Sequence, residues 1–398
     1  MPSQTRVGLV SIGIGCLCAC GTAAAHHSFG TFDMNSNIEI VGTIAGLDFV
    51  NPHSWLRIDA RGADGSAATY RCEMRGATVL RRSGWTPEMF VRGEPITVQG
   101  APDRVDPLAC YVNTLVLANG RTLDRYTQRG ADDGAAPAAT PPATAMPRMP
   151  SGVPNLAGDW AVEQQVMSDP RGRLGTLVPL SASSRFAGGA VPRDSIVLPG
   201  SEGFGVLATV AMLYRLAVGA VSPYGLPWID RAVLLTERGA AAAAPPEQHP
   251  QMQCVTTSII FNWYMETLVN RITQDETTVT MEYGYGLVRT VHLNAEHPAS
   301  IAPSRAGHSI GRWDGDVLVV DTVGFLPGML ALEVAHGDGL HAVERFALNS
   351  DGSVLTRDYT ATDADYFVGE YNGTDPTPRS PVPFAADVCN AALNPVRQ

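Results

Sequence analysis

A histidine and an aspartate face each other across the most regular hairpin that the sequence predicts. In residues 307–325, GHSIGRWDGDVLVVDTVGF, Asp314-Gly315 separates two extended runs. Asp-Gly favours a type I′ turn, whose two central residues both need positive φ. With these two residues as the loop, His308 lies directly opposite Asp321 on one face of the sheet. The register therefore predicts an imidazole–carboxylate pair.

A carboxylate that orients an imidazole can make it a general base, because it holds the ring in one tautomer. Three more polar side chains could complete such a site: Arg312 on the same face, and His341 and Glu344 on the next predicted strand. Ser309 lies within an ordinary strand, which argues against a serine hydrolase. The alternative is a structural cross-strand pair, worth about 0.2–1 kcal/mol.

Residues 1–25 are typical of an export signal. Arg6 precedes the apolar run Val7–Cys20, and Ala23-Ala24-Ala25 offers an A-x-A cleavage site. The run is too short to cross a bilayer, so we expect no transmembrane span. A second interpretation takes residues 17–20 as a lipobox with a lipid anchor at Cys20. Either way, the protein is predicted to be periplasmic or secreted.

Cleavage of this signal would create a terminus able to bind copper. Cleavage after Ala25 leaves His26 as the first residue, so its amine and imidazole could chelate one ion. Cleavage after Ala24 places His27 third, a pattern that suits square-planar Cu(II). His53 could be a further ligand. The alternative is a flexible polar tail, with His53 in an Asn-Pro-His turn.

Disulfides are expected, because an exported chain meets an oxidising compartment. Three of the seven cysteines lie in the signal, and the other four divide evenly between the two halves of the chain. The expected pairs are Cys72–Cys110 and Cys254–Cys389. Isolated buried thiols are the alternative.

The fold class is predicted to be mostly β, with two barrels. Residues 26–128 contain five strand-like runs, with a helical stretch at Ala77–Ser83 between the third and the fourth. The runs are Ile38–Val50, Ser54–Ala60, Ala68–Met74, Pro95–Gly100 and Ala109–Leu117. This is the order of an OB-fold. Residues 129–152 are rich in Ala and Pro and predict a disordered linker.

Residues 153–398 predict an antiparallel β-barrel built as a meander. Its expected strands are Trp263–Thr273, Thr277–Tyr283, Leu287–Leu293, His308–Trp313, Asp316–Val323, His341–Leu348, Val354–Thr360 and Tyr366–Tyr371. A two-residue loop at Asp351-Gly352 would place Arg345 opposite Asp358. The apolar run Phe204–Val221 is interrupted by Arg215 and predicts a buried or groove-lining helix.

Aromatic side chains and one methionine in the second half could line a pocket for a small apolar molecule. The candidates are Trp263, Tyr283, Tyr285 and Trp313, together with Tyr264, Met265 and Phe325. The alternative is that they form the core. The formal net charge of −11 and the absence of lysine argue against a nucleic-acid partner, which needs a basic surface.

Two parts of the chain resemble known bacterial sequences. Ala25-His26-His27-Ser28-Phe29, Asn51-Pro52-His53, Gly84-Trp85 and Gly100 resemble a family of exported proteins that is known only as a domain of unknown function. The second half is similar to the region that often follows this domain in uncharacterised proteobacterial proteins, and Gly158-Asp159-Trp160 is lipocalin-like. The resemblance implies an exported two-module protein and brings no activity with it.

The leading functional expectation is an exported protein that binds a small apolar molecule in its second barrel and copper at its N-terminus. The first alternative is a periplasmic acid–base enzyme, an isomerase, cyclase or hydro-lyase, that uses His308 and Asp321. An enclosed cavity around that pair would favour the enzyme, and a solvent-facing pair would argue against it. The second alternative is an envelope interaction protein.

Overall fold

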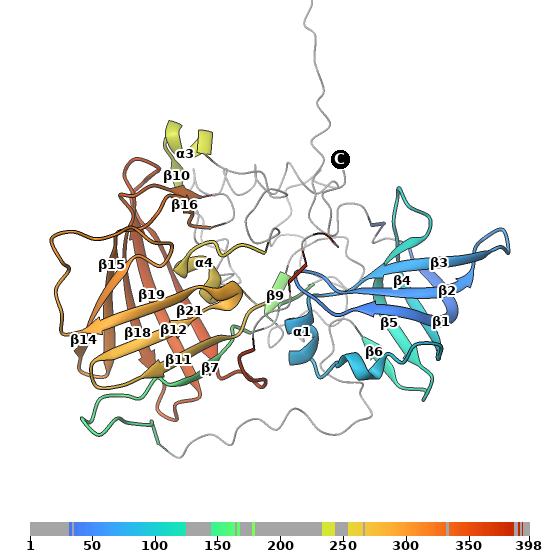
Figure 1. Cartoon of the computed structure of the whole chain (residues 1–398), viewed down its shortest axis with the longest axis horizontal. Helices are drawn as coiled ribbons and strands as arrows, with labels where there is room; N and C mark the ends of the chain where they lie inside the picture. The colour runs from blue at the N-terminus through green and yellow to red at the C-terminus, as the bar shows by residue number, and fades with distance from the viewer. Residues whose placement is uncertain are drawn as a thin grey trace, which may run out of the picture.

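The computed structural model describes two β modules that lie side by side (Figure 1). The described residues are 32–33, 36–124, 145–163, 165–167, 177–179, 233–242, 254–265, 267–331, 334–385, 389–390 and 392. Strands make up most of the regular structure in both modules, which confirms the predicted fold class. No helix in these ranges has the length and apolar character needed to cross a membrane.

The N-terminal module is a closed five-stranded barrel with a short sixth strand. Its elements are β1 (Ile38–Asp48), β2 (Trp55–Arg61), β3 (Ala67–Glu73), α1 (Ala77–Arg82), a 3-10 turn (Pro87–Met89), β4 (Pro95–Pro102), β5 (Ala109–Leu117) and β6 (Thr122–Asp124). The sheet order is β3-β2-β1-β4-β5-β6, and a further pairing of β3 with β5 closes the barrel. The predicted OB-like order, with a helix after the third strand, is confirmed.

A bulge and a disulfide shape this barrel. The β4–β5 register shifts between Gln99 and Gly100. A Cβ at Gly100 would lie 2.5 Å from the carbonyl oxygen of Tyr111, so only glycine allows the strands to approach here. Cys72 and Cys110 are paired residues of β3 and β5, and they form the predicted disulfide within the core.

The C-terminal module is a nine-stranded sheet in the order β21-β19-β18-β15-β14-β13-β12-β11-β7. The strands are β7 (Gly158–Trp160), β11 (Asn270–Gln274), β12 (Thr278–Glu282), β13 (Val288–Leu293), β14 (His308–Asp314), β15 (Val317–Val323), β18 (His341–Leu348), β19 (Val354–Thr362) and β21 (Tyr371–Pro378). The two edges meet where Trp160 bridges Arg379 and Ala161 donates to the carbonyl of Pro378. The sheet therefore nearly closes into a barrel.

One pairing in this sheet departs from the antiparallel expectation: β13 and β14 run parallel. Parallel neighbours need a long connection that returns the chain to the starting end. Residues 294–307 provide it, and they carry His297 to the beginning of β14. The other predicted hairpin register is confirmed, because Arg345 pairs with Asp358.

Short elements complete the described structure: β8 (Gln165–Met167), β9 (Leu177–Pro179), β10 (Leu234–Leu235), α3 (Glu237–Ala242), α4 (Ile259–Tyr264), a 3-10 turn (Gly284–Gly286), β16 (Gly328–Met329), β17 (Ala335–His336) and β20 (Phe367–Val368). The predicted strand at Trp263–Thr273 is wrong in its first part, because Trp263 belongs to α4. The hydroxyl of Ser258 accepts from the amide of Phe261 and caps this helix.

Two predicted segments fall mainly outside the described residues. The expected helix at Phe204–Val221 lies wholly outside them, as does most of the predicted linker. The end of the linker, 145–152, is described and contacts the C-terminal barrel. Arg148 there forms a two-pronged ion pair with Asp316, at 2.9 and 2.8 Å.

Candidate functional site

The hairpin of β14 and β15 forms, but its register differs by two residues from the prediction. The turn residues are Gly315 and Asp316, so His308 pairs with Val323 and Asp321 with Ile310. Gly315 has a φ of 61° and Asp316 is not in the positive-φ region, which matches a type II′ turn. Asp314 stays in the strand, where its carboxylate accepts from Arg345 at 3.2 Å. The predicted direct pair is therefore wrong.

A shift of two residues keeps both side chains on the same face, and His297 joins them. The Nδ1 atoms of His297 and His308 lie 2.8 Å apart, and the Nε2 of His297 lies 3.0 Å from one oxygen of Asp321. The other oxygen of Asp321 lies 3.0 Å from the Nε2 of His341. The ring of His292 stacks on His308 with centroids 5.4 Å apart. We call these five residues the histidine cluster.

These contacts decide which nitrogen of each ring carries a proton. Asp321 as a carboxylate only accepts, so the Nε2 atoms of His297 and His341 are its donors. The Nδ1 of a neutral His297 is then an acceptor, and the Nδ1 of His308 donates to it. The Nε2 of His308 is left with its lone pair, and no described residue hydrogen-bonds to it. The cluster is thus a directed chain from His308 through His297 to Asp321.

The surroundings favour these protonation states. Burial and the nearby rings of His297 and His292 lower the pKa of His308. Partial burial raises the pKa of Asp321, but the hydrogen bonds from His341 and His297 outweigh it and the pKa is lowered. Near neutral pH the chain therefore ends in a charged carboxylate at one end and an uncharged imidazole at the other.

The cluster lies on the outer face of the sheet and is partly covered. The side chains of His297, Asp321 and His341 are 22%, 34% and 45% exposed. His308 and Asp321 are thus neither enclosed in a cavity nor fully open to solvent. Ile310, Val323 and Val343 are half-buried neighbours in the same register. Arg312 is exposed further along β14, opposite Val319, outside the cluster.

The predicted place of Glu344 beside His341 is wrong, because three residues along a strand bring a side chain to the opposite face. Glu344 points into the barrel and is fully buried. Its carboxylate lies 2.6 Å from Arg289 and 3.2 Å from Arg357, and Asp375 also pairs with Arg357. This inner network carries two positive and two negative charges.

Every described donor of the network is occupied by the barrel itself. Arg289 also donates to three hydroxyls, those of Tyr283, Ser309 and Thr322. Arg357 also donates to the carbonyls of Ile259 and Ile260 in α4. Buried charges whose donors are taken up within the barrel hold a fold together. We therefore assign the inner network to structure.

The same network explains Ser309. The letters Gly307-His308-Ser309-Ile310-Gly311 match G-x-S-x-G, the pattern of a nucleophile elbow. The structure places Ser309 inside β14, 1% exposed, with its hydroxyl bonded to Arg289 and Thr322. Because the serine lies in a strand and faces the core, it is not a nucleophile.

The four predicted ligand-binding aromatic residues occupy three environments. Trp263 is fully buried and packs edge-on against Tyr283, at 6.2 Å, and against Phe346, at 5.5 Å. Tyr285 is half-buried in the 3-10 turn, with a φ of 62°. Trp313 is half-buried near the β14–β15 turn. The core alternative describes Trp263 and Tyr283.

The N-terminal histidines are only partly described. His26 and His27 lie outside the described residues, so the copper terminus stays a prediction. The Nδ1 of His53 lies 3.1 Å from Glu73. Burial and the charge of Arg75 lower the pKa of His53 to about 4. No group of three or more His, Cys, Asp or Glu side chains in the described ranges is arranged to hold a metal ion.

The second predicted disulfide, Cys254–Cys389, is also confirmed.

Comparison with known proteins adds one finding and one negative result. No curated protein matches the chain. Residues 15–108, which include β1 to β4, match DUF6152, a family of unknown function. The expected resemblance of the N-terminal module to a family of unknown function is thereby confirmed.

Proposed function

We propose that the protein binds a small molecule at the histidine cluster and moves a proton on it by acid–base chemistry. The observation that carries the proposal is the chain His308–His297–Asp321. It leaves the lone pair of His308 Nε2 available to a bound molecule. This is the arrangement by which a carboxylate orients a general base, here through a second imidazole.

The cluster supplies both halves of a proton transfer. The lowered pKa of His308 keeps its ring uncharged near neutral pH, as a base requires. A proton taken up at Nε2 makes His308 an imidazolium, and its Nδ1–H···Nδ1 bond to His297 is strengthened by that charge. Asp321 stabilises the positive charge through His297. His341 is hydrogen-bonded to the same carboxylate and is a second group in the site that can carry a proton.

The neighbours of the cluster indicate the substrate class. Ile310, Val323 and Val343 offer aliphatic surface beside the imidazoles, and no arginine belongs to the cluster. A small, mainly apolar molecule with one weakly acidic proton matches this combination. Isomerisation, cyclisation and elimination of water are the reaction classes that proton transfer alone can complete.

The experiment uses proton exchange, so that the reaction need not be known. The full-length protein in D₂O is incubated with a panel of enolisable ketones, including terpenoid and sterol ketones, and deuterium uptake is measured by mass spectrometry. We expect uptake with at least one member, and a loss of about 10²-fold or more in His308→Ala. The matched control is Thr290→Ala, because Thr290 is exposed on the face of β13 that also carries His292. Uptake in His308→Ala equal to that of the wild type, or uptake with the wild type equal to that in buffer for every member of the panel, would refute the proposal.

Binding of an apolar ligand without chemistry is the second candidate, and Trp313 favours it. The indole N–H of this residue is buried and has no hydrogen-bond acceptor among the described residues. A ligand oxygen at this end of the barrel would satisfy it. Thermal-shift screening against sterols and terpenoids tests this candidate. A shift that persists in His308→Ala and disappears in Trp313→Phe would assign the ligand to the barrel end.

Export supports either function. The signal-like start of the chain and the two disulfides in the described residues are both typical of a protein that folds in an oxidising compartment. We therefore propose that the protein is periplasmic or secreted. The mass of the protein recovered from cells after expression of the full gene tests this, since a soluble product should start at residue 25 or 26.

A further inference from the structure

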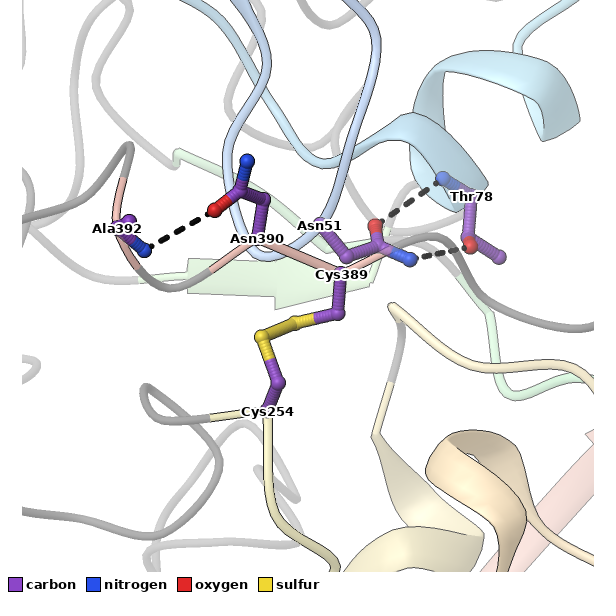
Figure 2. Close-up of a disulfide and its surroundings, with 6 residues drawn as sticks. All are labelled: Asn51, Thr78, Cys254, Cys389, Asn390 and Ala392. Carbon is purple, nitrogen blue, oxygen red and sulfur yellow. Dashed lines mark hydrogen bonds between the residues drawn. A yellow bond between two sulfur atoms is a disulfide. The ribbon is translucent and has the colours of Figure 1, made fainter.

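The disulfide Cys254–Cys389 joins two segments that are anchored in different barrels (Figure 2). Cys254 leads into α4, whose carbonyls at Ile259 and Ile260 accept hydrogen bonds from Arg357 in the C-terminal barrel. Cys389 forms a parallel bridge with Asn51 of the N-terminal barrel. The cross-link therefore spans the boundary between the barrels.

The anchor on the N-terminal side is firm. Asn51 is fully buried, and its carbonyl accepts from the amide of Asn390 at 3.0 Å. Its side chain donates to the hydroxyl of Thr78 at 3.0 Å and accepts from the amide of Thr78 at 3.3 Å, at the start of α1 (Figure 2). We call the segment Cys389–Asn390 the tail. Because the tail is paired with Asn51, it is held to the body of the N-terminal barrel.

The two disulfides differ in how easily a reductant can reach them. Cys72 and Cys110 are both 0% exposed in the core of the N-terminal barrel. Cys254 and Cys389 are both only half-buried. Thiol–disulfide exchange needs direct approach of a thiolate to one of the sulfurs, so access controls its rate. A reductant in solution can therefore attack the second disulfide while the first is protected.

The backbone at Cys254 adds an independent reason for reactivity. Its φ is 58°, in the left-handed region that non-glycine residues rarely occupy. Backbone conformations of this kind recur at functional sites, which supports Cys254 as the reactive half of the pair.

We propose that Cys254–Cys389 is a reversible thiol–disulfide exchange site that clasps the two barrels together. The thiolate of an external dithiol attacks one sulfur, forms a mixed disulfide and releases the other cysteine as a thiolate. The second thiol of the reagent then displaces the protein cysteine. The protein gains two electrons and ends with two thiols, and the reagent leaves as a disulfide. The tail is then held at Asn51 by its hydrogen bonds alone.

The first test measures selectivity on the oxidised full-length protein. Samples are treated with graded dithiothreitol under native conditions, trapped with iodoacetamide and analysed as peptides by mass spectrometry. We expect Cys254 and Cys389 to be labelled at least about ten-fold faster than Cys72 and Cys110. Labelling of all four together, or of Cys72 and Cys110 first, would overturn the proposal.

The second test asks whether the bond is the clasp. Hydrogen exchange at the amide of Asn390 and small-angle X-ray scattering are recorded for the wild type with and without dithiothreitol. We expect faster exchange and a larger radius of gyration after reduction. The double variant Cys254→Ser, Cys389→Ser should show both changes without reductant and no response to it. Wild-type exchange and radius in this variant would contradict the role as a clasp.

Discussion

Neutralising Glu344 separates a structural role from a catalytic one, because the sequence placed this residue in the site and the structure places it in the core. In Glu344→Gln the inner network loses one of its two negative charges. Asp375 still pairs with Arg357, so Arg289 is left in the barrel without a carboxylate. Burial lowers the pKa of Arg289, but Glu344 and Tyr283 together outweigh burial and raise that pKa, so the guanidinium stays charged.

The expected cost follows from this unpaired charge. Removing one partner of a fully buried pair costs about 3–5 kcal/mol of unfolding free energy. For a domain of this size, that corresponds to a fall of about 6–20 °C in the melting temperature. Urea unfolding followed by circular dichroism measures the free energy, and calorimetry measures the temperature. At a temperature where the variant is folded, deuterium uptake at the histidine cluster should match the wild type, because Glu344 faces the opposite side of β18.

Arg345→Ala is the matched control, since Arg345 is the next residue of β18 and faces solvent. Its ion pair with Asp314 joins side chains that are 46% and 65% exposed. Such a pair contributes about 0–1 kcal/mol. Equal stability of Glu344→Gln and Arg345→Ala would refute the account of the inner network. A folded Glu344→Gln that lost deuterium uptake would show that the residue serves the site after all.

Two further predictions concern histidines. The pKa of His53 falls to about 4 on folding, below the ordinary value of 6.5, so the unfolded chain binds the extra proton between these pH values. The stability that this group supplies is fully present above about pH 6.5 and is lost, by roughly 3 kcal/mol, as the pH falls toward 4. His53→Gln should flatten this part of the stability–pH profile, and an unchanged slope would contradict the buried, neutral state. The copper prediction is tested by Cu(II) titration of the mature protein against the double variant His26→Ala, His27→Ala, in which affinity should fall; equal affinity would remove the terminal site.

Local patterns predicted the N-terminal barrel well. Its strands are short, bounded by turn residues and paired mainly with near neighbours, so the order of runs around Ala77–Arg82 indicated the fold. The C-terminal sheet was harder, because the parallel pairing of β13 and β14 depends on the path of residues 294–307. That segment has no strand pattern, and no spacing in it predicts that His297 lies beside His308.

The errors at the site have equally specific causes. The frequency of Asp-Gly in hairpins predicts a turn at Asp314-Gly315, whereas Asp314 remains in β14 and pairs with Arg345. Proximity in the sequence predicts Glu344 near His341, but the two-residue period of a strand places their side chains on opposite faces. Alternation along β18 was the available signal, and it would have assigned Glu344 to the interior. The prediction that His308 and Asp321 share a face survived, because the register changed by an even number.

The protonation state of His308 tests the central claim most directly. Long-range ¹H–¹⁵N correlation spectra of the labelled protein at about pH 7.5 report which ring nitrogen carries hydrogen. The chain from His308 through His297 to Asp321 predicts a proton on Nδ1, a lone pair on Nε2 and a pKa below the ordinary value. In His297→Ala the preference for Nδ1 should be lost. A wild-type His308 that is protonated on Nε2, or is charged at this pH, would contradict the account.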